Sequence, residues 1–101
     1  MTVLWTRVAL RHLAEAREYI EIDDPAAAAR QIERIELSVN QLRSFPMMGR
    51  AGMRAGTREF AVPGTPYILV YRVKENAIQV VAVLHGARNW KAAETQTSFI
   101  K

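Results

Sequence analysis

Cysteine is absent from the 101-residue chain, which excludes disulfide bonds and thiolate chemistry. Because the chain also has only two histidines, we expect no metal site. No apolar run approaches the roughly 18 residues of a membrane-spanning helix, so we expect no membrane association. The first ten residues lack a charged segment followed by a long apolar stretch, and we therefore expect no signal peptide.

A glycine-rich loop followed by Lys-Ser or Lys-Thr is also missing, so we expect no nucleotide cofactor. These absences are compatible with a reducing cytoplasm, which is where we expect the protein. At this length the chain is a single domain, which we place over residues 1–101. The sequence leaves open whether the polar tail over residues 91–101 is a short helix or a flexible segment.

Positive charge is concentrated in one part of the chain. The formal net charge is +4, and the first half mixes both signs. Between Arg43 and Arg72 the only acid is Glu59, against five arginines: Arg43, Arg50, Arg54, Arg58 and Arg72. Such a balance favours an acidic partner, such as nucleic acid, a ribosome or an acidic protein, although charge that serves only solubility is an equal alternative.

The first half predicts a strand followed by two helices. Val3–Trp5 is a short apolar strand, and Thr6 can cap a helix that runs from about Arg7 to Ile22. One face of that helix carries apolar residues at four-three-four spacing: Ala9, Leu13, Ala16 and Ile20.

The second helix has the clearest periodic pattern. Asp24 suits its N-cap and Pro25 its first turn, and Pro46 disfavours helical geometry at Phe45, so the helix ends by Ser44. Its apolar face comprises Ala28, Ile32, Ile35, Val39 and Leu42. The linker between the helices is so short that they must form an antiparallel hairpin.

The second half predicts a loop and then a three-stranded antiparallel meander. We expect a loop over 47–56, strands over 57–62, 67–73 and 77–84, and tight turns between the strands. The apolar run Val80–Leu84 predicts a strand covered on both faces. The fold is therefore α+β: the helix hairpin packs on the sheet, and the N-terminal strand joins one of its edges.

Several segments from Trp5 to Trp90 resemble the RelE/ParE superfamily, the toxins of type II toxin–antitoxin modules. The resemblance lies in five segments: Gly49-Arg50 after Phe45-Pro46, Gly56-Thr57-Arg58-Glu59, Gly64-Thr65-Pro66-Tyr67, Val70-Tyr71-Arg72-Val73 and Leu84-His85-Gly86-Ala87-Arg88. It implies the α+β fold already expected and a growth-inhibiting protein, of a kind associated with plasmid stabilisation.

The resemblance favours ParE-like members, which poison DNA gyrase. RelE-like members, which cut messenger RNA on the ribosome, carry an arginine two residues before the Val-Tyr of the middle strand. Here Ile68 occupies that position, and no lysine precedes Lys74. We therefore expect gyrase inhibition by binding, without a reaction of its own. The alternative is a metal-independent ribonuclease, in which His85 moves a proton while Arg88 and Arg58 hold the phosphate. A third reading is a degenerate member that binds its antitoxin and harms nothing.

The expected contact residues fall into two groups. For the target they are Arg50, Arg54, Arg58, Arg72, Arg88 and Trp90. For the antitoxin they are Leu13, Ala16, Tyr19 and Ile20, taken as apolar surface left free on the first helix. Met47, Met48 and Met53 form a further apolar cluster that could accept a partner's helix.

The resemblance also implies a partner. It is a cognate antitoxin, encoded by the adjacent gene, with a DNA-binding region and an acidic tail, in a toxin–antitoxin hetero-oligomer. Opposite charge would speed the encounter of that tail with this basic chain.

Overall fold

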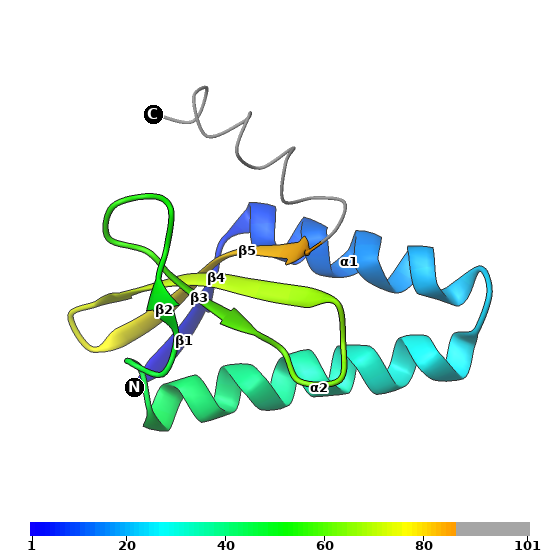
Figure 1. The fold of residues 1–101 in the computed structure, drawn as a ribbon, viewed down its shortest axis with the longest axis horizontal. Helices are drawn as coiled ribbons and strands as arrows, with labels where there is room; N and C mark the ends of the chain where they lie inside the picture. Colours follow the sequence, from blue (N-terminus) through cyan, green and yellow to red (C-terminus); the bar gives the residue numbers. More distant parts are fainter. Residues whose placement is uncertain (87–101) are drawn as a thin grey trace.

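The computed structural model of the protein describes residues 1–86 (Figure 1). The tail over 91–101, whose conformation the sequence left open, lies outside this range. The described elements are β1 Thr2–Trp5, α1 Arg7–Glu21, α2 Pro25–Ser44, β2 Arg50–Ala51, β3 Arg58–Ala61, β4 Tyr67–Lys74 and β5 Ala77–His85.

The strands form one sheet in the order β1-β5-β4-β3-β2. The meander of β3, β4 and β5 is antiparallel, while β1 pairs in parallel with β5 at one edge. The α+β fold, the meander and the edge position of the N-terminal strand are therefore confirmed. The prediction of a continuous loop over 47–56 was wrong, because Arg50 and Ala51 pair with Glu59 and Arg58 and so form β2.

The helices begin where their capping residues place them. The Thr6 hydroxyl accepts a hydrogen bond from the Ala9 amide at 3.0 Å, and the Asp24 carboxylate accepts one from Ala27 at 3.0 Å. Each cap satisfies an amide that has no partner within its helix. Helix α2 ends at Ser44, as the following Phe45-Pro46 predicts.

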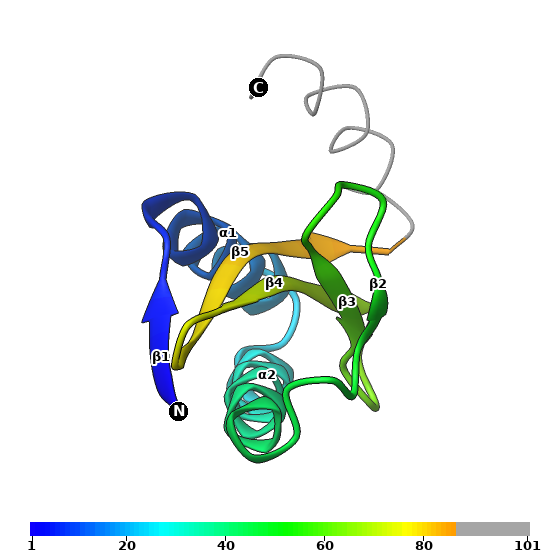
Figure 2. The same cartoon turned by 90° about the vertical axis from the view of Figure 1, so that its left-hand side faces the viewer.

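Both helices and one face of the sheet share a single core. The sheet curves around α2, which lies on its concave side (Figure 2). This face, here called the inner face, carries Tyr67, Leu69 and Tyr71 of β4, each at most 2% exposed. The helical residues in the same cluster are Ala9, Ala16, Ile32, Ile35, Val39 and Leu42. Most residues of the apolar helix faces predicted from periodicity therefore lie in the core.

Strand β5 is covered on both faces only in part. Val83 and Leu84 are consecutive and both buried, as the apolar run predicted, although Val81 and Ala82 are half-exposed. The alternation is broken because the register shifts opposite Val70/Tyr71, where a β-bulge leaves one extra residue in β5.

Where β1 ends, side chains of helix α1 and its N-cap form hydrogen bonds with the backbone of β5. The pairing of β1 reaches only Val80. Beyond it, the Thr6 hydroxyl donates to the Val81 carbonyl at 3.1 Å, and the Val83 amide donates to Nδ1 of His12 at 3.2 Å. Burial lowers the pKa of His12, and Arg11 adds to this effect while Glu15 opposes it. The neutral imidazole is therefore the form that completes this edge.

Acid should weaken the fold through His12. Because its pKa is lower when folded, its contribution is fully present above its unfolded pKa of 6.5 and is lost as the pH falls below that value. Between pH 7.5 and 5, denaturant titration should show a fall in the free energy of unfolding that His12→Gln lacks, because glutamine offers an acceptor that does not titrate. Thr6→Val, the matched control, should lower stability at every pH while keeping the slope. Equal slopes in wild type and His12→Gln would contradict this account.

Candidate functional site

The turn after α2 is fastened to the sheet by Tyr71. Its buried hydroxyl donates to the Pro46 carbonyl at 2.8 Å and accepts from the Gly49 amide at 2.9 Å. Arg58 adds a bond from Nη1 to the Gly49 carbonyl at 2.7 Å. A Cβ on Gly49 would lie 2.5 Å from the tyrosine oxygen, so this approach requires glycine. Burial raises the pKa of Tyr71, although the Gly49 bond and Arg58 oppose the rise.

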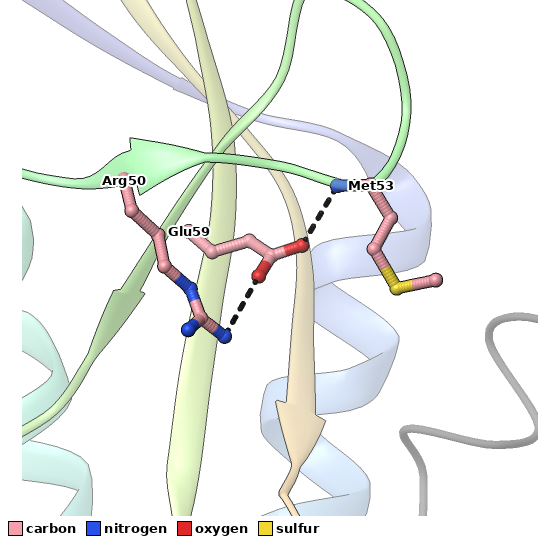
Figure 3. A network of polar contacts seen from close by, with 3 residues as sticks. All are labelled: Arg50, Met53 and Glu59. Atoms are coloured by element: carbon pink, nitrogen blue, oxygen red, sulfur yellow. Dashed lines mark hydrogen bonds and ion pairs between the residues drawn. The ribbon is translucent and has the colours of Figure 1, made fainter.

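A buried carboxylate organises the hairpin formed by β2 and β3 (Figure 3). The Glu59 side chain is only 5% exposed. One of its oxygens accepts from Nη2 of Arg50 at 3.3 Å, and the other accepts from the Met53 amide at 3.1 Å. Glu59 therefore fixes both β2 and the first residues of the loop that follows it.

The loop between β2 and β3 is also closed by its own hydrogen bonds. The Gly52 amide donates to the Thr57 carbonyl at 2.8 Å. The amide and hydroxyl of Thr57 both donate to the Arg54 carbonyl, at 3.1 and 2.7 Å. Gly56 supplies a φ of 80°, which residues with a Cβ rarely adopt. These hydrogen bonds hold the backbone of the loop but do not bury Met53, which is 60% exposed.

The arginines expected at the target are divided between the two faces of the sheet. Arg58 lies opposite Tyr71 on the inner face, where its guanidinium bonds the Gly49 carbonyl, so it serves the fold. Arg50 lies opposite Glu59 on the other face and is 73% exposed. Arg72 follows Tyr71 in the strand and so also points to that outer face.

The other residues expected at the target differ in exposure, and two of them lie outside the described residues. Arg54 is half-exposed on the β2–β3 loop. The Nε atom of Arg72 is buried and has no hydrogen-bond partner among residues 1–86. Arg88 and Trp90 lie outside the described residues. The structure therefore brings together Arg50 and Arg54 on one hairpin, while Arg58 is turned away from them.

Two of the three residues proposed for a ribonuclease, His85 and Arg58, lie far apart along β4. His85 lies opposite Tyr67, with the two rings in edge-to-face contact at 5.5 Å. Arg58 lies opposite Tyr71, which at about 3.3 Å per residue is roughly 13 Å further along β4. Arg88, the third member of this set, is outside the described residues.

The expected antitoxin surface on α1 is largely used by the fold. Ala16 is 6% exposed in the core, and the half-buried Leu13 and Ile20 pack against that core. Ala16 therefore offers no free surface, because the stripe that periodicity reveals is the stripe that meets the sheet, while binding of the antitoxin by Leu13 and Ile20 stays a prediction. Tyr19 is 51% exposed, and its part in antitoxin binding stays a prediction.

Apolar side chains are exposed elsewhere. Phe45, Met47 and Met48, in the segment that follows α2, are 66%, 65% and 42% exposed. The methionines were expected on the surface, whereas Phe45 was considered only as a helix boundary. An aromatic residue just past a helix end, beyond its apolar stripe, is the signal that could have identified it.

Within residues 1–86, no three or more histidine, aspartate or glutamate side chains gather as metal ligands would. No helix in the same range combines the length and apolarity that a membrane crossing requires.

The sequence is similar to a known protein family and to individual proteins. Residues 3–90 match the family described as the ParE toxin of the type II toxin–antitoxin system parDE. The chain is 41% identical over 88 residues to the toxin candidate Y4kP of Sinorhizobium fredii, covering 87% of this chain and 91% of that protein. It is 33% identical over 86 residues to the toxin RelE2 of Caulobacter vibrioides, covering 85% and 96%.

A solved structure is also similar. It is that of the chromosomal ParDE toxin–antitoxin system from P. aeruginosa, with a TM-score of 0.73 and 26% identity over 82% of this chain and 92% of that one.

Replacing Tyr71 should loosen the turn that it holds. Tyr71→Phe keeps the ring but leaves the Gly49 amide and the Pro46 carbonyl without partners, so the free energy of unfolding should fall by about 1–3 kcal/mol in denaturant titration. Hydrogen exchange at the Gly49 amide should accelerate as well. Tyr67→Phe, on the same face of β4, should leave that exchange unchanged. Slow exchange at Gly49 in both variants would refute the role given to Tyr71.

Proposed function

Because the chain belongs to the ParE toxin family of type II toxin–antitoxin systems, we propose that it inhibits bacterial growth by binding DNA gyrase. The observation that carries this proposal is the match to the ParE family over residues 3–90. Binding alone would block gyrase, and the chain would need no reaction of its own. The similar P. aeruginosa structure is that of a ParDE system, which supports the same choice.

The geometry of the described residues adds support. His85 and Arg58 lie far apart along β4, and Arg58 is bonded to Gly49. Ile68, where RelE-like members are expected to carry an arginine, is an apolar residue opposite Leu84. An apolar side chain cannot hold a phosphate, so the described part of the chain fits a binding toxin better than a nuclease.

A cognate antitoxin is the second element of the proposal. Toxins of type II systems are neutralised by a protein partner, and we place this one in the adjacent gene and the complex in the cytoplasm. An acidic antitoxin suits the charge of this chain, whose net value is +4. The complex would be a hetero-oligomer whose DNA contacts come from the antitoxin.

A ribosome-dependent ribonuclease is the second candidate. The 33% identity to the toxin RelE2 favours it. In that case His85 would transfer the proton, and Arg58 and Arg88 would bind the phosphate. For these residues to meet, the part of the chain beyond residue 86 would have to complete the site.

Two assays on the purified protein separate the candidates. We expect the protein to inhibit supercoiling by gyrase and to leave the messenger intact in a translating extract. When antitoxin is added first, both gyrase supercoiling and translation should be unaffected. Cut messenger with active gyrase would reject the gyrase proposal in favour of the ribonuclease. If the protein affects neither gyrase nor the messenger, it is a degenerate member of the family that retains only the ability to bind its antitoxin.

A further inference from the structure

We propose that the tip of the β2–β3 hairpin, Arg50–Arg54, docks into an acidic, apolar-floored recess on the folded protein that the toxin inhibits. Met53 is the apolar anchor, and Glu59 is a positioning residue that holds it there. The inference rests on the proposed function only in taking the target to be a protein. It assigns the contact to one element that is separate from α1.

The tip of the hairpin is held rigid by hydrogen bonds. Hydrogen bonds within the loop join Gly52 to Thr57 and Thr57 to Arg54, while Glu59 bonds the Met53 amide. These bonds fix the backbone on both sides of an exposed side chain. A side chain that is already held in place loses less conformational freedom when it binds, so more of its contact energy is retained as affinity.

The tip is also rich in positive charge. Glu59 is the only acid between Arg43 and Arg72, and its side chain is 5% exposed and bonded within the hairpin. The surface of the tip therefore carries Arg54, half-exposed, and Arg50, which is 73% exposed and whose guanidinium pairs with Glu59 through Nη2. An acidic partner would be attracted to it and would find arginines suited to carboxylates.

The tip has a projecting shape. The loop between β2 and β3 extends beyond the body of the sheet, on the side away from α2 (Figure 1, Figure 2). A projecting tip fits a concave site on a folded protein. The disordered tail of an antitoxin, by contrast, gains its affinity by spreading along an extended surface.

Met53 is an apolar residue at an exposed position of the tip. It is 60% exposed between two cationic positions, where burial in the chain's own core does not explain an apolar residue. A phosphate backbone would gain little from a thioether, whereas an apolar recess gains contact area from it. Met53 therefore distinguishes a protein target from RNA.

The test compares paired substitutions in the full-length protein. Met53→Gln keeps the length of the side chain and removes its apolar character, while Met53→Leu keeps the apolar character. Arg54→Gln removes a charge that Arg54→Lys retains. Arg17→Gln, on the exposed face of α1, is the control for net charge. For each variant we would measure the intracellular toxin level that halves growth, the affinity for purified antitoxin and the melting temperature.

Met53→Gln and Arg54→Gln should each raise the toxin level needed by about tenfold, as expected when one interface anchor is lost. Met53→Leu, Arg54→Lys and Arg17→Gln should stay within about twofold of wild type. Antitoxin affinity and melting temperature should be unchanged in all five. Glu59→Gln should resemble Met53→Gln in toxicity and should speed hydrogen exchange at the Met53 amide, which a general loss of stability would not confine to that site.

Other outcomes overturn the inference. Full toxicity of Met53→Gln would reject the apolar anchor, and a loss confined to Arg54→Gln would point to RNA instead. A parallel loss of antitoxin affinity would make the tip part of the antitoxin site. The wild type could arrest growth without inhibiting gyrase, and Met53→Gln and Arg54→Gln could both lose that arrest. This result would reject gyrase as the target and would support the docking tip. A wild type that never arrests growth would overturn both proposals.

Discussion

The buried hydroxyl of Tyr71 is the contact on which the geometry of the β2–β3 hairpin depends. By bonding Pro46 and Gly49 it fixes where the chain leaves α2 and returns to the sheet. Strand β2 begins at the next residue, Arg50, so its pairing with Glu59 follows from that fixed start. The Glu59 carboxylate then lies within reach of both Arg50 and the Met53 amide. One side-chain oxygen in the middle of β4 thus determines the geometry of a surface two strands away.

Much of this fold could be predicted from local chemistry. Capping at Thr6 and Asp24, the proline at 46 and the alternation of apolar residues located both helices and the meander. What could not be predicted depends on distant partners. Strand β2 is two residues long and exists only through its pairing with β3, and His12 meets Val83 across 71 residues of sequence. No local pattern at those positions indicates either contact.

The site illustrates a different limit. Counting arginines indicated a basic region correctly, but strand alternation sends Arg58 to the inner face and leaves Arg50 outside. Alternation was available from the sequence, whereas the partner of each guanidinium was not. On α1 the periodic stripe containing Ala16 was read as both core and binding surface, although one stripe cannot serve as both. Exposed residues outside the periodic pattern, such as Met53, mark surface function better.

The parallel pairing of β1 with β5 has a consequence for the order of events during synthesis. The first strand of the chain finds its place in the sheet only beside the last, and the bond from Thr6 to Val81 spans 75 residues. Contacts so distant in sequence form late, because the intervening chain must first be made and ordered. A chain still emerging from the ribosome therefore lacks the completed sheet. Topology alone therefore delays completion of the sheet until β5 has been made.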